Sequence, residues 1–215
     1  MKVIPFIYKD IDDVIANTYL VIDSSNNCFC IDPSVKYDGI KNYIKKNDLN
    51  LKGVLLTHGH FDHIRGVELL LNEFNVPLYI GFGDELLLKD PYLNCSDYFG
   101  SQSIKINANP IVISNQEIIH DLDEDIIVIA TPYHTIGSVC YYLKNSKILF
   151  SGDSLFKAGF GRDDLPNSVP QKRKDSISKI FNLPEDVKVY PGHGQFTTIK
   201  AERILNHLWK NNNLI

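Results

Sequence analysis

The heptapeptide Thr-His-Gly-His-Phe-Asp-His at residues 57–63 restricts the possible folds of this chain more than any other feature. It follows the short apolar run at 54–56, which is typical of a strand buried on both faces. It precedes residues 64–74, whose apolar side chains recur at helical spacing. Several potential metal ligands therefore stand together at a predicted strand-to-helix turn, where packing alone rarely places them.

The spacing within this turn predicts two neighbouring metal ions. At the end of a strand, His58 and His60 alternate onto one face, so both imidazoles can reach one ion. Asp62 and His63 are consecutive and fall where the helix begins, so they cannot share that side and can serve a second ion. Imidazole and carboxylate ligands suit zinc, iron or manganese.

Three further candidate ligands stand just beyond predicted strands, in turns that contain glycine or proline. They are His134 after residues 126–130, Asp153 after 147–150 and His193 after 187–190. Taken alone, each is more typical of an ordinary turn residue. Together with the turn at 57–63, they predict one shared cluster. The other two histidines, His120 and His207, we interpret as ordinary surface or helix residues.

The rest of the chain shows short apolar strands and amphipathic helices. Strands are predicted at 3–8, 18–23, 28–31, 51–57, 76–80, 111–113, 126–130, 139–143, 147–150 and 187–190. Helices are predicted at 37–46, 64–74, 84–89, 171–181 and 199–210. In each half the strands precede the helices, which fits two sheets packed face to face with helices outside. The length of 215 residues suits one domain over 1–215.

Composition argues against several classes of function. No apolar run approaches the ~18–20 residues of a membrane span, and the start lacks the features of a secretory signal. With a net charge of −4 and no basic tract, the chain is a poor general binder of nucleic acid or membrane surfaces. Its four cysteines include no Cys-x-x-Cys pair, which favours reduced, buried side chains. We expect a cytoplasmic monomer or small homo-oligomer.

The order His-x-His-x-Asp-His, then His, Asp and His, resembles the metallo-β-lactamase superfamily. The resemblance runs through nearly the whole chain. It implies an α+β fold, a four-layer αββα sandwich in a single domain, with the metal site at one edge of the sheets. It also implies Zn²⁺ as cofactor, as two ions, with iron or manganese as alternatives. The implied ligands are His58, His60 and His134 for the first metal, Asp62, His63 and His193 for the second, and Asp153 as a bridge.

Within the superfamily, the chain is most similar to glyoxalase-II-like (hydroxyacylglutathione hydrolase-like) enzymes. The matching segments are 17–21, 31–33, 131–139, 150–156, 161–166 and 189–194. This resemblance implies a hydrolase that cleaves a small-molecule thioester or ester by attack of a metal-bound hydroxide. Asp62 and Asp153 are the implied catalytic carboxylates.

Four features depart from that pattern. Tyr133 and Arg65 stand where glycine is usual, and Asp163 stands where threonine is common. In addition, glyoxalase II carries a C-terminal helical region that holds glutathione, whereas this chain ends soon after the helix predicted at 199–210. The resemblance therefore implies the hydrolytic chemistry of the group and leaves open whether glutathione is used.

Three residues are candidates for substrate binding. Arg162 and Lys157 follow Asp153, and each either meets an anionic group of the substrate or is a solvated loop residue. Arg162 suits an anion better because its guanidinium forms a paired fork. Tyr133 either lies over the pocket or packs inside the fold.

Two less regular regions, 81–110 and 154–170, are expected to shape the substrate pocket. Asp32 either orients a ligand group or simply ends a strand in an Asp-Pro turn.

Two other functions stay open. A mono-iron persulfide dioxygenase of the same fold uses two histidines and an aspartate, which this chain also offers. Oxygen uptake on a glutathione persulfide would indicate that activity, and thioester cleavage without oxygen would indicate the hydrolase. A non-catalytic metal-binding relative should have lost ligands, whereas all seven positions are filled here.

Overall fold

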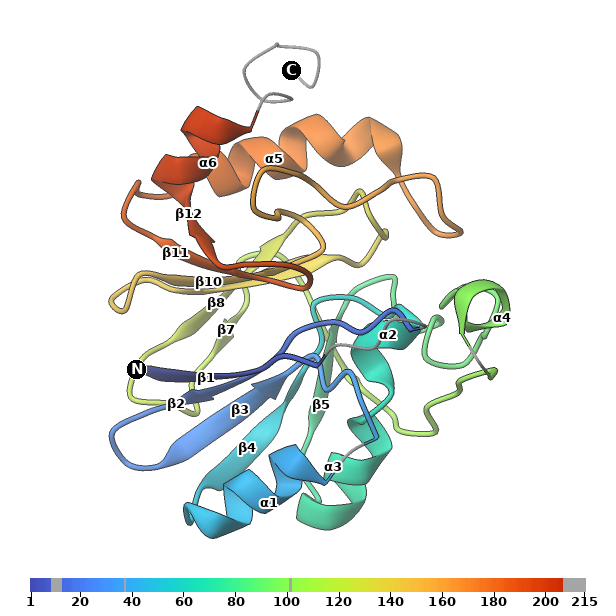
Figure 1. Ribbon diagram of the computed structural model, residues 1–215, viewed down its shortest axis with the longest axis vertical. Coiled ribbons are helices and arrows are strands. Elements are labelled where there is room, and N and C mark those ends of the chain that lie inside the picture. Colours follow the sequence, from blue (N-terminus) through green and yellow to red (C-terminus); the bar gives the residue numbers. More distant parts are fainter. Residues whose placement is uncertain (9–12, 37, 101, 207–215) are drawn as a thin grey trace.

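The computed structural model describes residues 1–8, 13–36, 38–100 and 102–206. Two six-stranded sheets lie face to face, and helices cover the outer face of each sheet (Figure 1). The predicted four-layer αββα sandwich is therefore confirmed.

The first sheet has the spatial order β1-β2-β3-β4-β5-β6. Its strands are Lys2–Phe6, Thr18–Ile22, Asn27–Ile31, Asn50–Leu55, Leu78–Gly81 and Ile111–Ile113. The second sheet has the order β12-β11-β10-β9-β8-β7. Its strands, from β7 to β12, are Ile118–Ile119, Ile126–Ala130, Val139–Leu143, Ile148–Gly152, Lys188–Pro191 and Thr197–Thr198.

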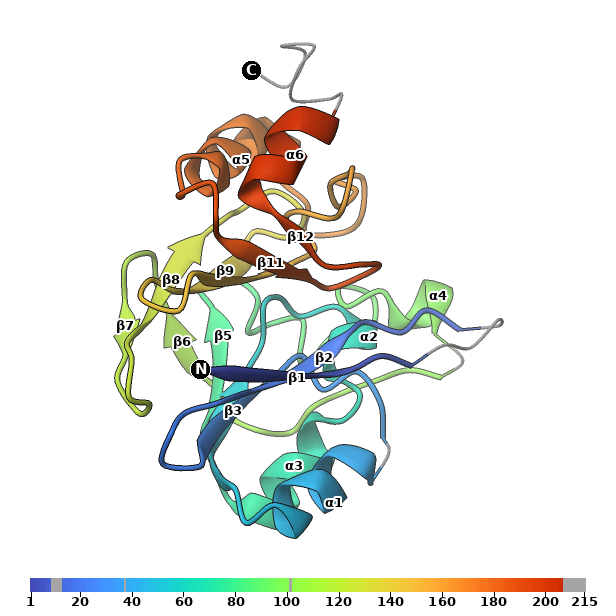
Figure 2. The same ribbon diagram turned by 60° about the vertical axis from the view of Figure 1, so that its left-hand side comes forward.

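The longer helices form the two outer layers, as both views show (Figures 1 and 2). Helices α1, Gly39–Lys46, and α3, Val67–Phe74, cover the first sheet. Helices α5, Arg173–Phe181, and α6, Ile199–Leu205, cover the second. A 3-10 turn at Pro170–Lys172 leads into α5.

Strand direction determines which loops share an edge of the sandwich. In the first sheet, β3, β4, β5 and β6 are parallel. In the second sheet, β10 and β11 are parallel. Strand β8 runs in the same direction as β10 because both are antiparallel to β9. The carboxyl ends of β8, β10 and β11 therefore lie at one edge of their sheet.

Three apolar clusters separate the four layers, and the two-residue period of a strand assigns side chains to them. In β2, Tyr19 and Val21 belong to the cluster between the sheets. Their neighbours Leu20 and Ile22 belong to the cluster under α1 and α3. The third cluster, which includes Ile180, packs α5 and α6 on the second sheet. Both faces of each sheet are thus covered, which explains the continuous apolar runs in the sequence.

The single helix predicted at 64–74 is wrong. The chain instead forms a short helix α2, Phe61–Ile64, and then α3. Gly66 lies at the break, where its amide donates to the Pro33 carbonyl at 2.7 Å. A Cβ at this position would lie 2.4 Å from the Val35 carbonyl oxygen, so the chain passes too closely for a larger residue.

Other differences concern short elements. Residues 85–89 form successive turns in place of the helix predicted at 84–89. Helix α4, Ser96–Phe99, and the strands β7 and β12 are absent from the sequence predictions, because elements of two to four residues show no periodicity. Residue 37 and residues 207–210, which the sequence assigns to helices, lie outside the described residues.

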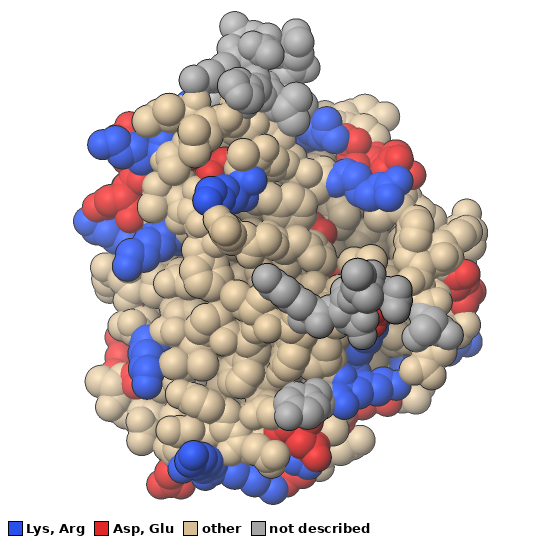
Figure 3. All heavy atoms as spheres, viewed as in Figure 1, with Lys and Arg blue, Asp and Glu red and all other residues tan. Residues whose placement is uncertain are grey.

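The cysteines agree with the sequence analysis. All four cysteines are buried and free. In the part of the chain that the structure describes, no helix has the length and apolar character to cross a membrane. On the face shown in Figure 3, acidic and basic side chains are interspersed with a large uncharged surface.

Candidate metal centre

Seven side chains converge at one edge of the sandwich, beyond the carboxyl ends of four strands. The structure thus brings together every residue that the sequence proposed as a metal ligand. They are His58 and His60 after β4, Asp62 and His63 in α2, His134 after β8, Asp153 after β10 and His193 after β11.

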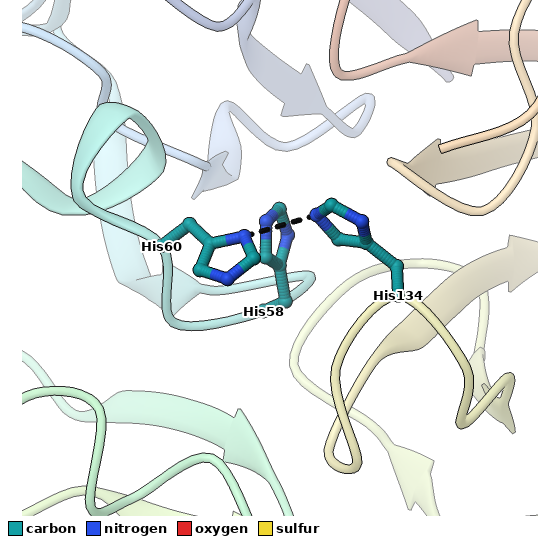
Figure 4. Close-up of side chains that lie close together, drawn as sticks. All are labelled: His58, His60 and His134. Carbon is teal, nitrogen blue, oxygen red and sulfur yellow. Dashed lines mark hydrogen bonds between the residues drawn. The ribbon is translucent and has the colours of Figure 1, made fainter. Parts of the chain in front are cut away.

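Three imidazoles form the first potential metal site. One ring nitrogen from each of His58, His60 and His134 lies within 4.8 Å of the other two. His60 Nδ1 and His134 Nε2 are 2.9 Å apart, and Figure 4 shows these two atoms facing each other beside the ring of His58. All three side chains are buried.

A second potential site adjoins the first. It consists of Asp62, His63 and His193, again with ligand atoms within 4.8 Å of one another. His193 Nε2 lies 3.0 Å from Asp62 Oδ2. Asp153 stands between the sites, with Oδ1 3.3 Å from His63 Nε2 and Oδ2 3.5 Å from His134 Nε2. One carboxylate can therefore serve both sites.

The approach of His193 to Asp153 depends on Gly192. A Cβ at this position would lie 2.2 Å from Asp153 Oδ1 and 2.7 Å from a ring carbon of His63. Only glycine lets the chain after β11 pass this close to the other ligands.

Asp32 supports the second site through contacts with Thr57 and His63. Its Oδ1 accepts a hydrogen bond from the Thr57 amide at 2.8 Å, and its Oδ2 accepts one from the Thr57 hydroxyl at 2.6 Å. Oδ2 also lies 2.9 Å from His63 Nδ1. With Nδ1 donating to this carboxylate, Nε2 of His63 is left facing the cluster. Asp32 therefore orients a candidate ligand, one of the two roles that the sequence left open.

The first site has similar supports. His134 Nδ1 donates to the carbonyl oxygen of Arg162 at 2.6 Å, which directs Nε2 toward the cluster. His58 Nδ1 lies 3.3 Å from the Thr57 hydroxyl oxygen. These contacts fix the rings before any ligand binds.

Four polar atoms of the cluster are buried and have no hydrogen-bond partner. They are His58 Nε2, His60 Nε2, His63 Nε2 and Asp153 Oδ1. Burying such atoms unpaired is costly. Three of these residues, His58, His63 and Asp153, also place ligand atoms within 4.8 Å of one another, which indicates a group that they bind together. Imidazole nitrogen and carboxylate oxygen are ligands that zinc and iron accept. The residues present therefore fit divalent metal.

The electrostatics of the cluster suit metal binding. Burial lowers the pKa of His58 well below its usual range and that of His60 to about 3, so both rings are neutral and free to ligate. For His63, burial lowers the pKa, but three surrounding carboxylates together raise it well above its usual value. A cation at the second site must displace the proton of His63, so metal binding there releases a proton.

Comparison with known proteins agrees with this geometry. A family model described as the Metallo-beta-lactamase superfamily matches residues 11–193. The chain belongs to this superfamily. The metallo-β-lactamase fold and the His/Asp cluster together imply that it binds divalent metal.

Individual relatives cover most of the chain. Hydroxyacylglutathione hydrolase GloC of Haemophilus influenzae is 31% identical over 192 residues, which make up 88% of this chain and 91% of that protein. The crystal structure of BLEG-1 B3 metallo-beta-lactamase is 30% identical, with a TM-score of 0.90 over 97% of this chain and 99% of that one. The crystal structure of TTHA1623 in a di-iron-bound form is 28% identical, with a TM-score of 0.78 over 90% and 94%.

In this member of the superfamily, the candidate ligands form the floor of a cavity of about 300 Å³. Five of them line it: His60, Asp62, His134, Asp153 and His193. The two regions that the sequence expected to shape the pocket do contribute its walls. Residues 81–110 supply Cys95 and Phe99, and residues 154–170 supply Phe156, Gly161, Arg162 and Leu165.

The two predicted cationic substrate residues lie in different places. Arg162 lines the cavity, but its guanidinium already forms two hydrogen bonds to Asp164, at 2.6 and 2.9 Å. Lys157 is exposed, is not among the residues lining the cavity, and donates to Gln195 at 2.5 Å.

Tyr133 packs inside the fold. It is completely buried in the cluster between the second sheet and its helices. Its hydroxyl donates to the Asp153 and Ser154 carbonyls, at 3.1 and 2.6 Å. The ring therefore supports the loop that carries a candidate ligand, which replaces the proposed substrate contact.

Two residues that depart from the glyoxalase-II-like pattern, Tyr133 and Asp163, contact the same arginine. The guanidinium of Arg173 lies 5.8 Å from the Tyr133 ring centroid and 2.6 Å from the Asp163 carboxylate. Arg173 therefore links Tyr133 to Asp163.

Arg65 also has a structural role. It forms a paired contact with Asp13, both distances being 2.7 Å, and its guanidinium stacks 4.8 Å from the ring centroid of Phe61. It therefore braces α2, which carries Asp62 and His63.

The sequence analysis did not single out Asp84, a buried acid. The Asp84 carboxylate accepts hydrogen bonds from the Gly59 amide, the Thr135 hydroxyl and the Gly137 amide, at 2.9, 2.7 and 2.8 Å. It also accepts one from the Asn167 side chain at 3.1 Å. A lone acid in an irregular segment gives no signal in the sequence, because its partners come from distant loops.

Proposed function

We propose that this protein is a metal-dependent hydrolase that cleaves thioesters. The observation that carries the proposal is Asp153, whose two carboxylate oxygens face two adjacent ligand sets at the floor of a cavity. The likeness to a hydroxyacylglutathione hydrolase supports a thioester as the substrate class.

Divalent cations held by these residues would lower the pKa of a bound water from ~15.7 towards neutrality and would polarise the substrate carbonyl. The side chains around the cavity contribute positioning. Asp62 lines the cavity while Oδ2 lies 3.0 Å from His193 Nε2, so its carboxylate can orient the attacking water. Asp153 holds the two sites at a fixed separation.

The cavity offers a poor alternative nucleophile. Cys95 is the one cysteine among the described residues that line it. Burial raises the pKa of this thiol to about 11, so it is protonated and weakly nucleophilic near neutral pH. This supports attack by water over a covalent acyl-enzyme.

The metal content tests the proposal first. Purified protein is loaded with zinc or with iron, and bound metal is measured by elemental analysis. We expect close to two ions per chain. The di-iron-bound form of a 28% identical structure makes iron a candidate beside zinc.

The reaction is then tested with and without oxygen. We expect the loaded protein to release a free thiol from thioesters at the same rate under nitrogen and air. Oxygen uptake on glutathione persulfide by a protein with one iron would indicate the dioxygenase instead. Turnover of a chromogenic cephalosporin without thioester cleavage would indicate a β-lactamase, a reaction that the 30% identical B3 enzyme makes worth testing.

A further inference from the structure

We infer that the substrate presents an uncharged, apolar group beside the scissile carbonyl, and that Phe99 helps to select it. This inference rests on the proposed thioester hydrolysis and names its substrate class. It follows from the wall of the cavity above the candidate metal centre, which is mostly apolar and whose one Lys or Arg among the described residues, Arg162, is paired with Asp164.

The apolar wall is built by side chains from several separate segments, among them Val14 in the segment before β2. Phe61 begins α2, Cys95 and Phe99 lie at the two ends of the α4 region, and Leu165 comes from the loop before α5. Phe156 adds an aromatic ring, whose centroid lies 5.9 Å from that of His193. An apolar group on the substrate would lose water against this wall, which is favourable.

Most of the wall is held rigidly. Phe61 and Cys95 are buried members of the cluster under α1 and α3, and Leu165 packs against the same cluster. Val14 and Phe99 differ because they are 48% and 51% exposed, and Phe99 is the larger side chain. It is therefore the wall residue with the most apolar surface left to cover.

The size of the cavity suits a group as large as a phenyl ring. Its volume is about 300 Å³. An apolar cavity of roughly 150 Å³ is enough to hold benzene. The cavity thus has room for a ring or a short alkyl chain in addition to the scissile group.

The charged side chains at the cavity also favour an uncharged group on the substrate. Arg162 is the one Lys or Arg side chain among the described residues lining the cavity, and its Nε and Nη2 donate to the carboxylate of Asp164, so its charge is already paired there. A substrate carboxylate against this wall would meet a guanidinium whose charge Asp164 already balances, and burying a charge against apolar side chains is costly. An anionic acyl group or a glutathione carrier should therefore be disfavoured.

The geometry defines the chemistry of this group but leaves two sources for it, the acyl part or the thiol part of the thioester. Two sets of substrates separate them. The first varies the acyl group on N-acetylcysteamine, using acetyl, butyryl, phenylacetyl and the anionic succinyl group. The second keeps the acetyl group and varies the thiol, using N-acetylcysteamine, benzyl mercaptan and glutathione.

We expect kcat/KM of the metal-loaded protein to rise at least about tenfold with the apolar group in one of the two sets, as is usual for added methylenes in an apolar pocket. Succinyl and glutathione substrates should be poorer than their neutral counterparts. Phe99→Ala should reduce the apolar preference by about tenfold. Phe82→Ala, at a phenylalanine that is 69% exposed and lines a different cavity, should leave the preference unchanged.

Binding without turnover keeps this inference separate from the proposed reaction. Acetohydroxamate and phenylacetohydroxamate share one metal-binding head, and their dissociation constants are measured by calorimetry on the metal-loaded protein. We expect the phenyl compound to bind at least about tenfold more tightly, and Phe99→Ala to remove the difference.

The outcomes are distinct. If no thioester is cleaved but the phenyl compound binds more tightly, the proposed reaction is wrong. The inferred preference of the cavity for an apolar group is then still supported. If thioesters are cleaved with similar kcat/KM values for all substrates in both sets, or with charged groups preferred, the inference is overturned. The proposed hydrolase function is then still supported.

Discussion

The carboxylate of Asp84 accepts a hydrogen bond from the Gly59 amide at 2.9 Å. Gly59 separates His58 from His60, so this bond fixes the backbone between two ligands of the first site. The same carboxylate binds Thr135 and Gly137, in the loop that follows His134. One buried acid thus joins the two loops that supply all three imidazoles of that site.

Replacing Asp84 with alanine should therefore damage both the fold and the first metal site. At least two buried donors lose their acceptor, each at about 1–3 kcal/mol, so the free energy of unfolding should fall by roughly 2–6 kcal/mol. Metal content should fall below that of the wild type. Denaturant titration and elemental analysis measure the two effects. Asp121→Ala, at an exposed acid, serves as control, and wild-type metal content in Asp84→Ala would contradict the prediction.

Asp84 should also make stability depend on pH. Burial raises its pKa from 3.8 to about 6, so the folded chain binds this proton more tightly than the unfolded chain does. Its stabilising contribution is therefore full below pH ~4 and is lost as pH rises through about 6. Two pKa units correspond to roughly 3 kcal/mol.

The measurement compares metal-free wild type with Asp84→Asn, which cannot titrate. Between pH 4 and pH 7, the free energy of unfolding of the wild type should fall relative to that of the variant. Other titrating groups are common to both chains and cancel in the difference. A difference that does not change with pH would disprove this assignment.

His58 belongs to the first ligand set and lies within reach of the second, because it groups with His63 and Asp153 as well. His58→Ala should abolish metal retention and hydrolysis while leaving a folded chain. Elemental analysis, thioester assays and circular dichroism test this. His120→Ala is the matched control, since the His120 side chain is 71% exposed and lies outside the cluster. Turnover by His58→Ala at the wild-type rate would rule out the proposed site.

Asp32 should raise the metal affinity of the second site without itself binding the metal. Its Oδ2 holds His63 Nδ1 at 2.9 Å, and the loss of such a partner typically weakens metal binding 10–100-fold. Asp32→Asn should therefore lower the affinity for the second ion by roughly that factor, with the first ion retained. Competition with a coloured chelator measures both affinities. Equal weakening of the two ions would instead indicate a general loss of structure.

Metal removal should destabilise the chain, because it leaves buried atoms such as His58 Nε2 and Asp153 Oδ1 without a partner. Ligand at 100 times its dissociation constant stabilises a protein by about 2.7 kcal/mol. We expect Tm to fall on adding EDTA and to recover on adding zinc. An unchanged Tm would mean that the cluster holds no metal under these conditions.

The sequence by itself determined the ligand chemistry and the fold. The spacing of His58, His60, Asp62 and His63 is a local property, since a strand end followed by a helix start sets where each side chain points. The order of strands and helices likewise predicted two packed sheets with helices outside, because each sheet must bury its apolar faces.

Tertiary structure decided what surrounds those ligands. Tyr133 and Arg162 lie close to His134 and Asp153 in the sequence, yet one is buried and the other is paired with Asp164 at the cavity. Asp84 acts on loops 25 and 53 positions away. Such contacts leave no periodic trace in the sequence, because irregular loops obey no repeating geometry and meet only once the two sheets have packed.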